Sequence, residues 1–235
     1  IDKASCSLTS LPIVDHQGLL LVGLSQKVSK EKLNEFLVPL DSQIKEFNFA
    51  KLKNIAVRKF EVAANWKLVV SLSHESYHFA NLHRESLAPI MTSHSVFDQF
   101  GMHTRWAFPL KGIERWAQKP RIDWPKKLPG AISHTLFPGT VIVVNAQDAQ
   151  IIRVEPGSSV DCSVVYYSGG CANSDLMEES LQAYNFGGDI FANEDLPVAE
   201  QCQQGIMARQ ADIIIGKNEP VVQLWHRLWR GELDS

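Results

Sequence analysis

Apolar and polar positions along the chain follow two different periods, and each period predicts one kind of element. Residues 55–63 alternate apolar and polar side chains over part of their length, and residues 19–22 are continuously apolar, so both segments are predicted to be strands. Residues 66–78 place apolar side chains at three-, four- and seven-residue steps, which predicts a helix. Residues 29–45 have similar spacing with a break at Pro39, which predicts a short helix and a loop. Asn65 precedes the second helix and is a suitable N-cap.

The second half of the chain reads as a sheet followed by helices. Four apolar stretches separated by short turns are typical of an antiparallel meander; they are residues 131–137, 140–145, 149–154 and 159–167. Earlier segments predict a strand at 102–108, a short helix at 111–118 and a loop at 120–130. After Gly170 the spacing becomes helical, at residues 175–184, 196–209 and 219–229. We therefore predict the α+β class, an antiparallel sheet with helices on one side.

Composition and charge exclude several classes of protein. The 235 residues are 45% hydrophobic, which is enough for a sizeable core, and the net charge of -3 provides no basic field for nucleic acid. No apolar run is long enough for a membrane span and no signal peptide is recognisable, so we expect a cytoplasmic protein. The four cysteines form no CxxC pair, which indicates reduced structural thiols rather than a zinc or disulfide framework.

The candidate chemistry is concentrated in residues 65–83. Three of the eight histidines lie there, His74, His78 and His83, together with Glu75. On a helix Glu75 and His78 are roughly 60° apart and can meet, whereas His78 and His83 are roughly 140° apart. Both can therefore face one metal ion only if the helix ends or bends within residues 79–82. His74 would share a face with His78, so spacing alone leaves that pair open as an alternative.

A third ligand is needed, because two imidazoles alone would hold a metal ion weakly. Asp195 is the best candidate. It precedes a predicted helix with Pro197 in its first turn, so its ordinary role would be that of an N-cap.

Several of these residues together resemble the catalytic-domain signature of Rieske-type non-haem iron oxygenase α subunits, the aromatic-ring-hydroxylating oxygenases. The similar positions extend over nearly the whole chain: His16 to Leu24, Asn65-Trp66-Lys67-Leu68, Glu75 to His78, His83, Asn193-Glu194-Asp195, Glu200, Gln203, Gly205, Ile206, Asn218-Glu219-Pro220 and His226. The H-x4-H pair, with NWK before it and ED-x4-E-x2-Q after it, is more specific than any one piece.

The resemblance implies a helix-grip (START/Bet v1-like) domain that holds mononuclear Fe(II) by His78, His83 and Asp195. Such a 2-His-1-carboxylate triad leaves positions open for O₂. Glu75 would be the carboxylate that links an iron histidine to a Rieske cluster in a neighbouring subunit and orients the imidazole. The implied protein is a homo-trimeric mono- or dioxygenase that hydroxylates or demethylates a small aromatic or quaternary ammonium substrate. A reductase or ferredoxin would supply its electrons.

Two features depart from the family pattern. Ser71-Leu72 stand where the family usually has Glu-Asn, and the chain contains no C-x-H followed by C-x2-H, which a [2Fe-2S] Rieske cluster requires. Because the chain begins at Ile1 and soon enters a strand, we expect the cluster on an upstream domain. Residues 1–24 would then be the tail of that domain with its linking strand, and residues 25–235 the catalytic domain.

Two other functions remain open at the level of sequence. The missing cluster ligands and Ser71-Leu72 are compatible with a non-catalytic helix-grip module that binds a ligand in its cavity. A zinc hydrolase using the same three ligands is the third reading, because zinc also accepts His and carboxylate and keeps a position for water. Metal analysis distinguishes these hypotheses.

Overall fold

The chain divides into two compact units, Ile1–Leu52 and Lys53–Ser235, in a computed structural model that describes residues 6, 8–125, 129–145, 148–208 and 214–233. The first unit contains a hairpin and two short helices: β1 (Ile13–His16), β2 (Leu19–Val22), α1 (Lys30–Leu37) and α2 (Asp41–Phe47). The hairpin turn places Gln17 and Gly18 at positive φ, as a two-residue turn of this kind requires.

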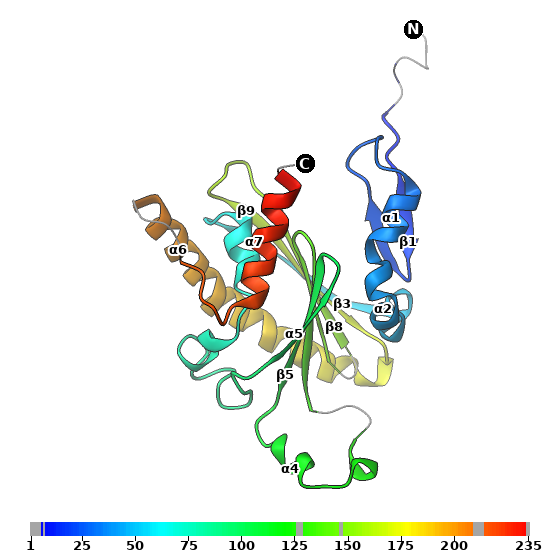
Figure 1. Ribbon diagram of the computed structural model, residues 1–235. Coiled ribbons are helices and arrows are strands. Elements are labelled where there is room, and N and C mark those ends of the chain that lie inside the picture. Colours follow the sequence, from blue (N-terminus) through cyan, green and yellow to red (C-terminus); the bar gives the residue numbers. More distant parts are fainter. Residues whose placement is uncertain (1–5, 7, 126–128, 146–147, 209–213, 234–235) are drawn as a thin grey trace. The chain divides into compact units, whose positions relative to one another are not determined.

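The second unit is built on a seven-stranded antiparallel sheet (Figure 1). Its strands lie in the order β3 (Lys53–Val62), β9 (Ser163–Cys171), β8 (Asp148–Pro156), β7 (Thr140–Val144), β6 (Gly130–Leu136), β5 (His103–Pro109) and β4 (Val96–Phe100). Strands β4 to β9 are therefore neighbours in chain order, which confirms the predicted meander, and β3 closes the far edge against β9.

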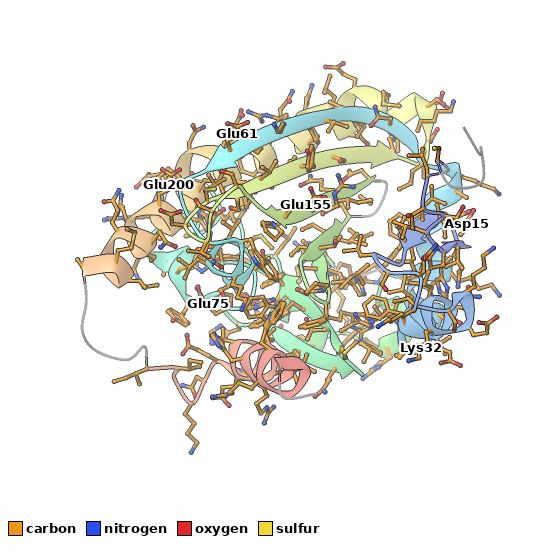
Figure 2. The ribbon with its side chains drawn as sticks, turned by 90° about the horizontal axis from the view of Figure 1, so that it is seen from above. Asp15, Lys32, Glu61, Glu75, Glu155 and Glu200 are labelled. Carbon is orange, nitrogen blue, oxygen red and sulfur yellow. The ribbon has the colours of Figure 1, made fainter. Side chains whose placement is uncertain are left out.

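The longer helices of the second unit collect on one side of the sheet, as predicted for the α+β class. With α3 (Trp66–Ser71) they are α5 (Met177–Ile190), α6 (Leu196–Ala208) and α7 (Pro220–Leu233), whereas α4 (Glu114–Ala117) lies in the connection between β5 and β6 (Figure 1). Helix α5 packs against β3 and β9, where the fully buried Tyr184 meets Tyr167 with ring centroids 5.2 Å apart. Figure 2 shows Glu61 of β3 and Glu200 of α6 at the same end of the sheet, where Glu200 accepts a 2.9 Å hydrogen bond from the Ala63 backbone N–H.

Three local predictions were wrong or incomplete. The helix predicted for residues 66–78 ends at Ser71, and Tyr77–Ala80 forms a separate 3₁₀ turn. The Ser71 hydroxyl donates to the Lys67 carbonyl at 2.7 Å, a side-chain bond that competes with the helical pattern. The strand predicted at 159–167 starts at Ser163 and continues to Cys171. Strand β4 was not predicted.

Asp195 is not an N-cap. It closes a π-helical turn, Phe191–Asp195, that joins α5 to α6 in one continuous helical run. The Leu196 N–H bonds to the Phe191 carbonyl, five residues back, so the backbone donors that a cap would satisfy already have helical partners. Residue 209, the end of the predicted helix 196–209, lies outside the described residues.

No helix in the described part of the chain is both long and apolar enough to cross a bilayer.

Candidate metal centre

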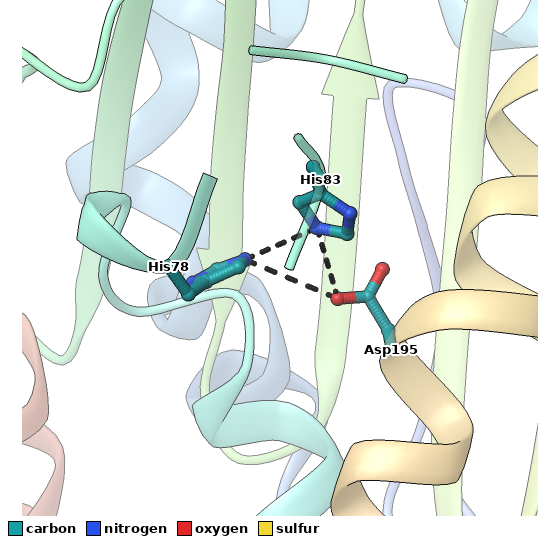
Figure 3. Close-up of side chains that lie close together, drawn as sticks. All are labelled: His78, His83 and Asp195. Carbon is teal, nitrogen blue, oxygen red and sulfur yellow. Dashed lines mark hydrogen bonds and ion pairs between the residues drawn. The ribbon is translucent and has the colours of Figure 1, made fainter. Parts of the chain in front are cut away.

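Three side chains from distant parts of the second unit converge on one point (Figure 3). His78 Nε2 lies 3.2 Å from His83 Nε2, and Asp195 Oδ1 lies 3.2 Å from His83 Nε2 and 3.9 Å from His78 Nε2. The side chains are 15%, 2% and 14% exposed in the order His78, His83, Asp195, so the point is largely shielded from solvent. These are the three residues that the sequence predicted as ligands.

Two irregular elements bring the donors together. His78 lies in the 3₁₀ turn Tyr77–Ala80, and His83 follows it in an irregular segment, so the chain changes direction between the histidines. The predicted break therefore exists, although it begins earlier than residue 79. The π-helical turn supplies Asp195 from the opposite side. Such turns are frequent at functional sites, because the extra residue redirects neighbouring side chains.

Glu75 orients His78. Its carboxylate accepts from the His78 ring Nδ1–H through one oxygen and from the His78 backbone N–H through the other, at 3.2 Å. Figure 2 labels Glu75 on the segment after α3. The predicted contact between Glu75 and His78 is thus present, without the helix that was expected to carry it. With its proton held on Nδ1, His78 directs the Nε2 lone pair toward His83 and Asp195.

Glu194 does the same for His83, a role that the sequence did not predict. Its carboxylate oxygen accepts from the His83 Nδ1–H at 2.8 Å and from the Ser86 hydroxyl at 2.9 Å. Burial alone would lower the pKa of His83, but the carboxylates of Asp195 and Glu194 outweigh burial and raise that pKa above its ordinary value. The signals in the sequence were that Glu194 is adjacent to Asp195 and belongs to the Asn193-Glu194-Asp195 stretch of the family resemblance.

The donor set fits a divalent metal ion such as Fe(II). Glu75 and Glu194 each accept a hydrogen bond from an Nδ1–H, which leaves the two Nε2 atoms facing each other and the Asp195 carboxylate. In the neutral imidazoles both Nε2 lone pairs are available to a metal ion. Donors about 2.1 Å from one ion and at right angles would lie about 3.0 Å apart, close to the two shorter separations.

The metal centre opens into an apolar cavity of about 360 Å³. His78, His83 and Asp195 line it together with side chains from the sheet and from α5. Leu72 also lines the cavity, whereas the Ser71 hydroxyl bonds back to its own helix. The two residues that depart from the family pattern, Ser71 and Leu72, therefore have different environments. A cavity of this size accommodates a small organic molecule beside the metal position.

The remaining histidines lie elsewhere. His74 is fully buried, packs edge-on against Trp225 at 5.4 Å between ring centroids, and has no hydrogen-bond partner among the described residues. Burial, with a smaller effect of His226, lowers the pKa of His74 to about 3. His103 and His134 are buried on β5 and β6, and neither is among the described residues that line the cavity. The alternative pairing of His74 with His78 is therefore not seen.

Together these features define an α+β helix-grip domain with a candidate 2-His-1-carboxylate site that lines an apolar cavity. Residues 49–235 match the family model described as ring hydroxylating alpha subunit (catalytic domain). The chain belongs to this family, which confirms the resemblance predicted from the sequence.

Solved structures share the fold at low sequence identity. The quaternary ammonium Rieske monooxygenase CntA, in complex with an inhibitor, has a TM-score of 0.78 at 16% identity, covering 98% of this chain and 64% of that one. NdmA of Pseudomonas putida CBB5 has a TM-score of 0.54 at 14% identity, covering 94% and 59%. The chain thus spans less than two thirds of these relatives. Comparison with curated proteins gives no significant match.

Proposed function

We propose that this chain is the catalytic part of a non-haem iron oxygenase that hydroxylates or demethylates a small organic substrate with O₂. The observation that carries the proposal is the convergence of His78, His83 and Asp195 in the wall of an apolar cavity. Fe(II) bound there would supply coordination positions for O₂ and its reductive activation. The family match supports this reading.

The protein's own residues have distinct parts in this proposal. Glu75 and Glu194 keep the protons of His78 and His83 on Nδ1, so that both Nε2 atoms remain available as ligands. Asp195 contributes the negative charge. The apolar cavity wall excludes water and holds the substrate next to the metal position.

Electron supply belongs to the proposal as well. We propose a Rieske [2Fe-2S] cluster on an upstream domain, of which residues 1–24 would be the tail, with residues 25–235 as the catalytic domain. Glu75 contacts His78 directly, which is consistent with a bridging role between that histidine and a cluster in a neighbouring subunit of a trimer. A reductase or ferredoxin would reduce the cluster, and the protein would be cytoplasmic.

The test is iron binding under anaerobic conditions. We expect about one Fe(II) per chain, as a facial triad implies. His78→Ala should abolish stoichiometric binding, while His94→Ala, at an exposed histidine, should leave it unchanged. Wild-type protein that binds no stoichiometric iron would favour the non-catalytic ligand-binding module instead. Oxygen consumption that depends on an added reductase would exclude the zinc hydrolase.

A further inference from the structure

A pair of buried polar side chains lines the cavity and takes no part in the metal centre. Gln150 on β8 is 7% exposed and Tyr167 on β9 is 1% exposed. The Tyr167 hydroxyl donates a hydrogen bond to Gln150 Oε1. Gln150 is paired with Gly169 and Ile152 with Tyr167 in the strand register, so the two side chains come from the same face of neighbouring strands.

One hydrogen of the Gln150 amide is left without an acceptor. A side-chain amide carries two N–H donors. Gln150 Nε2 donates to the Ala183 carbonyl of α5 at 3.3 Å, and no other acceptor lies within reach among the described residues. Since a buried donor without a partner is costly, the free N–H at the cavity wall is suited to a hydrogen-bond acceptor on the occupant.

Helix α5 sets the distance between this pair and the metal ligands. Gly187 lies against the pair, and a Cβ at this position would be 2.7 Å from the Tyr167 hydroxyl and 2.8 Å from Gln150 Oε1. Asp195 follows eight residues later in the same helical run, a rise of about 12 Å. The pair and Asp195 therefore lie beside different turns of one helical run, and both line the same cavity.

Charge restricts the occupant further. None of the described residues that line the cavity is Lys or Arg. Two carboxylates line it, Glu75 and Asp195, and both belong to the metal centre. Arg58 lies beside Tyr167 but is already paired with Asp189 at 2.8 Å. A carboxylate placed beside Gln150 would therefore lose its hydration without gaining an unpaired cation, which is strongly unfavourable.

We propose that Gln150, fixed by Tyr167, selects substrates whose end remote from the oxidised carbon is uncharged and carries a carbonyl-type acceptor. The inference rests on the proposed function, because it takes the cavity as the substrate chamber. It narrows the substrate class to neutral-ended, largely apolar compounds of about two rings. Gln150 is thereby a specificity-determining residue.

Calorimetric titration with three compounds of one two-ring frame tests this selection without turnover. The probes are coumarin, which carries a carbonyl acceptor, naphthalene, which carries none, and 2-naphthoate, which is anionic. We expect the wild-type chain to bind coumarin about tenfold more tightly than naphthalene, the size of one net hydrogen bond. The 2-naphthoate ion should bind most weakly.

Variants assign the preference to the pair. Gln150→Met keeps the side-chain length and should reduce the coumarin-to-naphthalene ratio to about one. Tyr167→Phe releases Gln150 Oε1 and should lower the ratio at least threefold. Gln204→Met, the same replacement at an exposed glutamine of α6 outside the cavity, is the control and should leave the ratio unchanged. If Gln150→Met fails to fold, Tyr167→Phe decides the question.

Three results overturn the proposal: a ratio near one in the wild type, tightest binding of 2-naphthoate, or a ratio that persists in the folded variants of Gln150 and Tyr167. Iron titration of the same protein separates this outcome from the proposed function. A chain that binds iron without preferring coumarin loses only the specificity role of Gln150. A chain that prefers coumarin but binds no iron loses only the oxygenase activity.

Discussion

Each of the two imidazoles at the metal centre is held by a carboxylate that does not itself point at the metal position. Glu75 bonds to His78 and Glu194 bonds to His83, while Asp195 faces both Nε2 atoms. Such outer carboxylates fix the tautomer and increase ligand basicity, so their loss weakens metal binding without removing a ligand.

Glu194→Ala should therefore lower Fe(II) affinity about 10- to 100-fold while the protein remains folded. Glu194→Gln should recover part of the loss, because its amide oxygen can still accept from the His83 Nδ1–H. Anaerobic titration with Fe(II) measures both. Glu155→Ala, at an exposed ion pair with Arg153 on β8, is the matched control, and unchanged affinity in Glu194→Ala would remove Glu194 from the site.

Burial of His74 should make the stability of the protein depend on pH, independently of metal binding. Its pKa is lowered from 6.5 to about 3 by burial, so the folded protein holds it neutral while the unfolded chain protonates it near 6.5. Its contribution to the free energy of unfolding is complete above pH 6.5 and is lost as the pH falls toward 3.

Replacing His74 by Phe, which keeps a ring against Trp225 but does not titrate, should flatten the loss of stability between pH 6.5 and 4. Urea unfolding of the metal-free protein at several pH values measures this, with His94→Gln at an exposed site as control. Iron stoichiometry should be unchanged in His74→Phe. If the free energy of unfolding of His74→Phe fell between pH 6.5 and 4 as much as that of the wild type, the burial argument would be contradicted.

At the scale of elements, the π-helical turn directs the adjacent side chains of Glu194 and Asp195 toward the metal centre. Residues 191–195 join α5 to α6 without a break, and Glu194 and Asp195 at the end of the turn lie against opposite nitrogens of His83. An uninterrupted α-helix would place residues after the turn about 100° away around the axis.

Deleting the exposed Asn193 should convert this turn into ordinary α-helix and rotate the helix on one side of it by that angle. We expect helical content by circular dichroism to persist and Fe(II) affinity to fall more than tenfold. Asn193→Ala, which keeps the residue count, should bind iron normally. Retained affinity in the deletion variant would show that the turn is not needed to present Asp195.

At the scale of the whole molecule, the metal position joins segments that are more than a hundred residues apart in the chain. His78 and His83 come from the connection between α3 and β4, and Asp195 from the helices that cover the sheet. A ligand that binds only the folded state adds RT ln(1 + [L]/Kd) to the free energy of unfolding.

Free Fe(II) at a hundredfold excess over its Kd should thus stabilise the protein by about 2.7 kcal/mol. Anaerobic urea unfolding with and without Fe(II) measures the difference, and His78→Ala should show no such gain. Stabilisation of equal size in His78→Ala would place the metal elsewhere.

The sequence by itself determined the α+β class and most of the strands and helices, because alternation and helical spacing are local properties that burial on one face imposes. It also singled out His78, His83 and Asp195 as candidate ligands, and the structure brings these three side chains together. The partnership of Glu75 with His78, three residues apart, was within reach of the same local reasoning.

Only the tertiary structure decided what depends on contacts between distant residues. The helix after Asn65 stops at Ser71, Asp195 lies in a π-helical turn rather than at a cap, and Glu194 contacts His83 although the two are 111 positions apart in the sequence. Nothing in the sequence pointed to Gln150 and Tyr167, because only the strand register and the close approach of α5 at Gly187 bring their side chains together. Local periodicity predicts which face is buried, whereas packing decides which side chains meet there.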